Sequence, residues 1–220
     1  MRTARGAGVA LALLLASACG DRACGGRGGV PPGRLPVVNR GDGRTYRFLD
    51  KGAWKGYYDE RGRIAVAEYD SNDNGRADYV AHYDHDKQIR LIEVDEDHDA
   101  WVDRWEHYDA AGVLEKVGRW RRRKGHEDEW TYRGSDGRPE RIEYDDSGDG
   151  RVDRAEVFRD GAIVGIETDS DRNGSIDRWQ RWEGGRLVAE ELDTNGDGTP
   201  DRRLVFGEKA RLLRIERLAP

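Results

Sequence analysis

Acidic and amide side chains recur at alternate positions in five short segments of this chain. A chain that turns around Ca²⁺ can offer oxygen atoms from the first, third, fifth and ninth positions of a loop. The pattern therefore predicts five metal-binding loops. Their residues at those four positions are Asp70, Asn72, Asn74 and Asp78; Asp95, Asp97, Asp99 and Asp103; Asp145, Ser147, Asp149 and Asp153; Asp169, Asp171, Asn173 and Asp177; and Asp193, Asn195, Asp197 and Asp201.

The sixth and twelfth positions differ among these loops. A calcium loop turns sharply at its sixth residue, where glycine adopts positive φ without a steric penalty. Four loops have glycine there, and Ala100 replaces it in the 95–103 loop, which should strain that turn. At the twelfth position, Glu106 and Glu156 complete the ligand strings of the 95–103 and 145–153 loops. The expected cofactor is Ca²⁺.

Turn propensity alone is the competing explanation, because Asp, Asn and Gly all favour turns. It does not require four oxygen-bearing groups at alternate positions in every copy. Like charges held so close together repel when no cation is present. We therefore favour calcium over simple turn formation.

A degenerate sixth copy interrupts the series. The copies start at 70, 95, near Arg119, and at 145, 169 and 193, so their spacings are 25, 24, 26, 24 and 24 residues. Arg119, Arg121 and Arg123 stand at the expected ligand positions, so this copy cannot bind a cation. Either these guanidinium groups neutralise neighbouring acids, which we favour, or they form a basic patch for an anionic glycan or lipid head group.

The residues between loops predict the elements that position them. Each loop is followed by about five residues ending in an aromatic, then a short turn, then a run rich in β-branched residues and leucine. Neither run has room for a three-turn helix. We expect an all-β fold, an elongated antiparallel array of tandem β-hairpin repeats of 24–26 residues over 37–220. Strands are expected at 104–108 and 178–182.

These repeats resemble known families. The loops are similar to the calcium loops of EF-hands, dockerins and thrombospondin type 3 repeats. The turns resemble the YD repeats of Rhs-type proteins, as in Tyr58-Asp-Glu-Arg-Gly62 and Tyr108-Asp-Ala-Ala-Gly112. The combination resembles repeat lipoproteins of bacterial cell envelopes. It departs from the EF-hand in having no flanking helices, and from YD repeats in carrying an acidic loop.

The N-terminus is typical of an export signal. Arg2 and Arg5 precede the short apolar run 6–16, and Ser17-Ala18 leads directly to Cys19. This arrangement resembles a lipobox, which implies a signal peptide at 1–18, a lipid on Cys19 and a flexible tether at 19–36. The alternative is ordinary cleavage after Ala18, with Cys19 and Cys24 free to pair.

Composition limits the classes of function. The formal net charge of −6 does not suit nucleic-acid binding. The carboxylates stand in repeated polar loops rather than in an apolar pocket that would shift a pKa. No phosphate loop or dinucleotide fingerprint is present. His82, His85 and His98 could form a transition-metal cluster, although surface positions suit them better. We therefore expect a protein that is not an enzyme.

The predicted function is that of a calcium-binding structural or adhesive repeat protein. The predicted location is the cell envelope, at the outer membrane or cell surface, through the lipid anchor. The rival prediction is a carbohydrate- or protein-binding module whose aromatic and arginine faces hold an envelope glycan or a protein, with calcium incidental. An envelope hydrolase is a third alternative.

Overall fold

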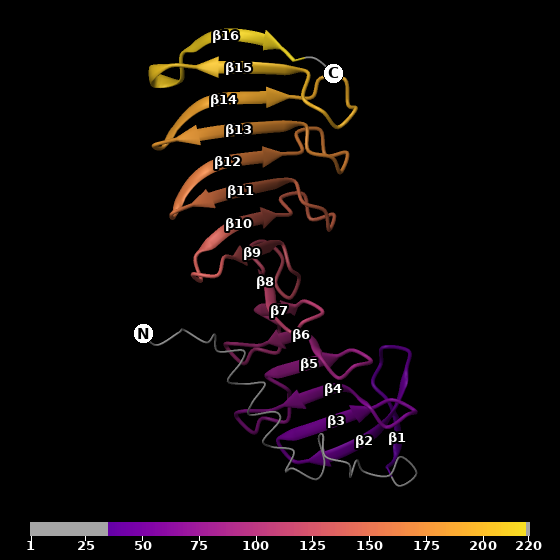
Figure 1. The fold of residues 1–220 in the computed structure, drawn as a ribbon. Helices are drawn as coiled ribbons and strands as arrows, with labels where there is room; N and C mark the ends of the chain where they lie inside the picture. The colour runs from indigo at the N-terminus through magenta and orange to yellow at the C-terminus, as the bar shows by residue number, and fades with distance from the viewer. Residues whose placement is uncertain (1–34, 219–220) are drawn as a thin grey trace. The chain divides into compact units, whose positions relative to one another are not determined.

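The chain is described by a computed structural model that covers residues 35–218. This part of the chain is all-β and runs as consecutive antiparallel strands joined by turns and loops (Figure 1). The strands are β1 Val37–Asn39, β2 Thr45–Lys51, β3 Trp54–Tyr58, β4 Ile64–Tyr69, β5 Tyr79–Tyr83, β6 Ile89–Val94, β7 Arg104–Tyr108, β8 Leu114–Arg119, β9 Glu129–Arg133, β10 Pro139–Tyr144, β11 Arg154–Arg159, β12 Ala162–Thr168, β13 Arg178–Glu183, β14 Arg186–Leu192, β15 Arg202–Phe206 and β16 Leu212–Arg217, with a short 3-10 helix at Glu208–Ala210.

The predicted fold class is confirmed. Strand order in the sheet follows chain order from β1 to β16. The strands expected at 104–108 and 178–182 are β7 and β13, and β13 continues to Glu183. Each acidic loop connects one hairpin to the next, and tight turns close the hairpins themselves. The loops therefore share one side of the strands within a unit, and the turns share the other.

The hairpins divide into two compact units, one ending at Val117 and the other beginning at Gly118. The predicted signal peptide and Cys19 lie outside the described residues. No helix among residues 35–218 is long and apolar enough to cross a membrane.

One face of the first unit carries its apolar core. Ala67, Ala81 and Ile92 lie opposite one another on β4, β5 and β6 and are almost fully buried. Gly56 continues this row on β3, opposite Ala67, and a Cβ there would collide with the ring of Trp54. The missing side chain at Gly56 thus leaves room for the ring of Trp54. Burying a side chain such as Ile92 contributes about 2–3 kcal/mol.

The second unit has fewer buried apolar side chains than the first, and arginine side chains pair with acids within and across its strands. Arg141 lies 2.8 Å from Glu143 and 2.8 Å from Glu167. The guanidinium of Arg154 lies 3.9 Å from the ring centroid of Tyr144. Long arginine stems cover apolar surface while their charged ends stay near water. In this way, charged side chains can cover the apolar surface of a thin sheet in a chain with 37% charged residues.

A β-bulge recurs at the turn end of the hairpins. The register shifts directly before the terminal aromatic residue, as between His82 and Tyr83, between Val157 and Phe158, and between Val205 and Phe206. An extra residue there bends the strand and increases its twist. The hairpin pattern did not predict these bulges.

Candidate metal-binding loops

The five acidic loops close in the same way. In each, the backbone N–H of the ninth residue donates to the carbonyl of the residue before the first, over 2.8–3.0 Å, as from Asp78 to Tyr69. The sixth residue has positive φ in every loop, and Ala100 adopts φ 75° where the others have glycine. The fourth residue is also left-handed, as at Asp73 with φ 60° and His98 with φ 63°. The expected turn at the sixth position is therefore present in the 95–103 loop without glycine.

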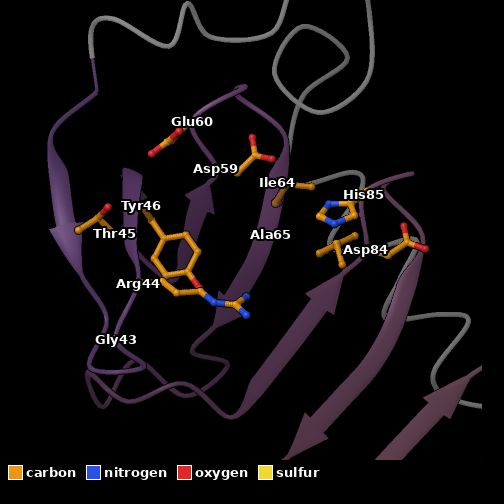
Figure 2. A pocket seen from close by; sticks show the side chains of 11 residues that line it. Gly43, Arg44, Thr45, Tyr46, Asp59, Glu60, Ile64, Ala65, Asp84 and His85 are labelled. Carbon is orange, nitrogen blue, oxygen red and sulfur yellow. The ribbon is translucent and has the colours of Figure 1, made fainter.

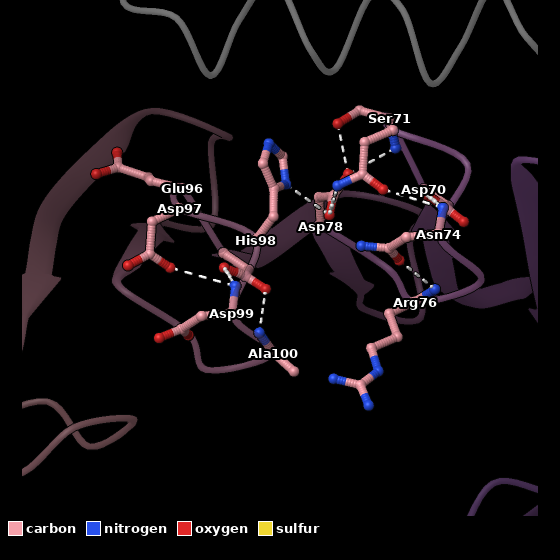
Figure 3. Close-up of polar contacts among 12 residues, drawn as sticks. Asp70, Ser71, Asn74, Arg76, Asp78, Glu96, Asp97, His98, Asp99 and Ala100 are labelled. Carbon is pink, nitrogen blue, oxygen red and sulfur yellow. Dashed lines mark hydrogen bonds and ion pairs between the residues drawn. The ribbon is translucent and has the colours of Figure 1, made fainter.

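The first aspartate of each loop organises the loop backbone. Asp70 accepts the backbone N–H of Asn74 at 3.2 Å and of Gly75 at 2.7 Å (Figure 3). Asp95, Asp145, Asp169 and Asp193 make the equivalent bond to their sixth residue. Burial opposes the charged form of Asp145, but hydrogen bonds from Gly150 and Gly148 outweigh it and lower the pKa of this carboxyl. The folded loop therefore favours the charged form of Asp145.

The ninth aspartate accepts backbone N–H groups from the second or third residue of the loop. Asp78 accepts the backbone N–H of Ser71 at 2.6 Å and also the Ser71 hydroxyl. Asp103, Asp177 and Asp201 accept the N–H of their second residue, and Asp153 that of Ser147. Asp78 is 2% exposed. Burial opposes its ionisation, but the bonds from Ser71 and His98 lower the pKa of Asp78.

Two loops bring three carboxylates together. In one group, oxygens of Asp95, Asp97 and Asp99 all lie within 4.8 Å of one another, and in the other those of Asp169, Asp171 and Asp177 do so. Either group could hold a metal ion. Figure 3 shows Asp97 and Asp99 on the loop next to the one that carries Asp70 and Asn74.

The amide and hydroxyl oxygens at the third and fifth positions support the backbone two residues further on. Asn72 accepts the N–H of Asn74 at 3.0 Å, and Asn74 accepts that of Arg76 at 2.8 Å. Asn173 and Asn195 make the same kind of bond, as do Asp149 and Asp197. Ser147 accepts the N–H of Asp149 at 3.4 Å and also donates its hydroxyl to Asp145. These side chains thus shape the loop in addition to offering oxygens.

The two glutamates expected at the twelfth position are engaged elsewhere. Glu106 lies on β7, is 3% exposed, and pairs with Arg104 and with the Tyr108 hydroxyl at 2.7 Å. Glu156 lies on β11 and pairs with Arg154 at 2.5 Å. Neither belongs to the carboxylate groups described above. The sequence carries a signal for this pairing. An arginine directly follows the ninth aspartate of four loops, at 104, 154, 178 and 202.

The basic loop, residues 120–128, begins one residue later than the repeat spacing predicts. The N–H of Asp128 donates to the carbonyl of Arg119, which makes Trp120 the first residue and Asp128 the ninth. Trp120, Arg122 and Lys124 therefore occupy the first, third and fifth positions, rather than Arg119, Arg121 and Arg123. The regular spacing was hidden because the acidic residues that mark it are absent.

Asp128 still closes the basic loop, although the first, third and fifth positions of this loop carry no acidic residue. It is 4% exposed and accepts the N–H of Arg121 at 2.7 Å and of Arg122 at 2.8 Å. Arg121 in turn lies 2.6 Å from Asp146 on the next loop. This contact agrees with the interpretation that arginine neutralises neighbouring acids.

Neighbouring loops also touch where both are acidic. Nδ1 of His98 lies 2.8 Å from Oδ1 of Asp78, and Arg151 approaches the carbonyl of Asn173 at 3.4 Å. The three histidines considered for a metal cluster have separate partners: His98 contacts Asp78, His82 contacts Glu93 at 2.9 Å, and His85 contacts Arg63.

A separate pocket of about 580 Å³ lies at the turn end of the first unit (Figure 2). Tyr46, Ile64 and Tyr83 line it, with Arg44 and Glu60 among its charged residues. It contains none of the loop residues described above.

Comparisons with known proteins leave the family open. No family model matches the chain, and no curated protein matches it. Among solved structures, that of the GtfA/B complex bound to UDP and GlcNAc is 16% identical, with a TM-score of 0.30 over 62% of this chain and 25% of that one. The chain thus spans a quarter of that structure's length. A similarity this low carries no argument about function.

Proposed function

We propose that this protein is a non-enzymatic, calcium-binding repeat protein with a structural or adhesive role. On this proposal a lipid on Cys19 holds it at the bacterial cell envelope. The observation that carries the calcium proposal is the contrast between the acidic loops and the basic loop. Five loops keep oxygen-bearing side chains at the first, third and fifth positions, whereas the basic loop closes around Asp128 without them. Acids at those positions are therefore dispensable for closing a loop.

The chemistry of the grouped side chains favours calcium among the common metals. Both groups offer carboxylate oxygens only, without histidine or cysteine. Hard cations such as Ca²⁺ prefer oxygen ligands and tolerate irregular geometry, whereas Zn²⁺ and Cu²⁺ favour nitrogen or sulfur. Bringing three carboxylates together costs repulsion that a divalent cation would relieve.

A calcium titration of residues 37–220 tests the proposal. We expect binding at about 10⁻⁴–10⁻³ M, the range of exposed extracellular modules. Because each ion binds the folded state, calcium should also raise the melting temperature. No heat of binding and no change in melting temperature at millimolar calcium would contradict it.

The variant Asp171→Asn tests whether the calcium response depends on the charge of the loop or only on its backbone conformation. Asp171 accepts the N–H of Asn173 at 3.2 Å, a bond that an asparagine oxygen can also accept. The variant should lose part of the calcium response yet match the parent protein in chelator. Asp136→Asn, at an exposed hairpin turn, is the matched control. Equal destabilisation with and without calcium would mean that these aspartates only shape turns.

The pocket near Tyr46 favours the second candidate function, the binding of an envelope glycan or a protein. Aromatic rings beside charged side chains suit a carbohydrate, because the rings offer an apolar surface and the charged groups accept and donate hydrogen bonds. Glycan binding that persists in chelator and is lost in Tyr46→Ala would favour this candidate over the first.

A further inference from the structure

Strand β16 presents an edge that is unpaired within residues 35–218. It pairs with β15 on one side and is the last strand of the described sheet. Leu212, Leu213 and Ile215 are 44%, 58% and 62% exposed. Soluble proteins usually protect such edges with short strands, proline or inward-pointing charge. Strand β1 follows this rule, with three residues, whereas β16 has six.

The backbone of β16 directs hydrogen-bonding groups outward at its centre. The N–H of Leu218 donates to the carbonyl of Asp201 at 2.9 Å, so Leu218 faces β15. Successive residues of a strand direct their N–H and C=O groups to opposite sides. Glu216 and Arg214 therefore face β15 as well, while Ile215 and Arg217 direct these groups to the open edge.

The charges around Ile215 are complementary to themselves. Arg214 and Glu216 flank it and lie 2.6 Å apart on one face of the sheet. If a second β16 is laid antiparallel with Ile215 opposite Ile215, each Arg214 lies opposite the other copy's Glu216. Opposite charges directly across a strand pair stabilise it, and like charges destabilise it. A second copy of β16 therefore supplies the complementary charges by itself.

We propose that β16 is the surface through which two copies of this chain associate, antiparallel and two-fold symmetric about Ile215. The contact uses the same edge of both copies, so it closes at a dimer. One strand from each copy buries less than the roughly 1,200 Å² typical of stable complexes. The dimer therefore forms reversibly and depends on protein concentration.

Sedimentation of the full 220-residue chain in detergent tests the proposal. Chelator is included throughout, so that calcium bridges between acidic loops cannot contribute. The mass should rise from one copy to two with increasing concentration. Ile215→Lys places two ammonium groups opposite each other and should weaken association by about fivefold, while thermal unfolding shows that the variant is folded.

Charge exchange tests the register and separates it from the contact within one strand. Arg214→Glu and Glu216→Arg should each lose the dimer, because like charges then face one another across the two-fold axis. An equimolar mixture of the two variants should recover it, since every facing pair is again opposite in charge. The pair within each strand stays like-charged in the mixture, so recovery reports the contact between copies.

Arg138→Glu and Glu183→Arg are matched controls, with side chains 65% and 66% exposed and the same changes in charge. They should associate like the parent chain. Three results would each overturn the proposal: a parent chain that stays monomeric at the highest concentration, an Ile215→Lys variant that dimerises normally, or a mixture that fails to recover. Growth beyond two copies would also overturn it, because it indicates head-to-tail contact with β1.

Discussion

The Nδ1 atom of His98 lies 2.8 Å from Oδ1 of Asp78, so the fourth residue of one acidic loop contacts the ninth residue of the loop before it. Asp78 is also a predicted calcium ligand. The imidazole thus forms a hydrogen bond to a carboxylate oxygen that would otherwise be available to coordinate the ion.

His98→Ala should therefore strengthen calcium binding at the 70–78 loop. The expected gain is up to about fivefold, because the His98 side chain is 43% exposed and water screens its pairing with the buried Asp78. Calorimetry measures it, and His82→Ala is the control because His82 contacts Glu93 on the strands instead. Equal affinity in His98→Ala and the parent would show that the imidazole does not compete.

Ile92→Ala should destabilise the first unit by about 2–5 kcal/mol, because truncation of a buried side chain leaves a cavity. Ile92 is fully buried between neighbouring strands. Val113→Ala, at a residue 60% exposed, should change stability by less than about 0.5 kcal/mol. Denaturant unfolding of both variants checks the comparison, and a loss of similar size in both would contradict the assigned core.

Asp128→Ala should destabilise the second unit equally with and without calcium. It leaves the N–H groups of Arg121 and Arg122 without their acceptor, at a cost of about 1–3 kcal/mol. Asp136→Ala, at an exposed turn, is the control. Thermal unfolding in calcium and in chelator provides the measurement, and a loss seen only in calcium would assign a metal to the basic loop.

Asp59 should contribute to the loss of stability in acid. Burial opposes its charged form, but hydrogen bonds from Arg63 and Arg61 outweigh burial and hold the pKa of Asp59 below its ordinary value of 3.8. The unfolded chain therefore takes up a proton first, and the stabilising contribution is lost as pH falls below 3.8 through the folded pKa.

Asp59→Asn removes this titration and should make the acid limb of stability against pH less steep. Glu60→Gln, at the exposed neighbouring residue, should leave the limb closer to that of the parent. Chemical unfolding at a series of acid pH values compares the three proteins. Superimposable limbs for Asp59→Asn and the parent would contradict the assignment.

Cys19→Ser tests the predicted anchor. If Cys19 carries the lipid, the variant should leave the membrane fraction, because an acyl chain contributes about 0.8 kcal/mol per buried CH₂ group. Cys24→Ser should stay with the membrane and is the matched control. Membrane retention of Cys19→Ser after fractionation would refute the lipobox interpretation.

Local signals were sufficient to predict the fold class. A repeat of 24–26 residues, each with one loop, one tight turn and two short runs, leaves hairpins as the only regular structure that fits. Glycine, asparagine and aspartate mark the turns through their backbone preferences, which act over a few residues. The same local chemistry identified the acidic loops, including the turn at Ala100.

The partners of individual side chains and the start of the basic loop became visible only in the folded chain. Glu106 looks like a loop ligand when residues are counted along the chain, but the pleat of β7 directs it toward Arg104. The start of the basic loop at Trp120 became visible only through the hydrogen bond of Asp128 to Arg119. The pairing of His98 with Asp78 depends on how adjacent hairpins stack, which spacing along one chain does not specify. Turns and strands are thus readable from sequence, whereas the partners of individual side chains follow from the pleat, register and twist of the sheet.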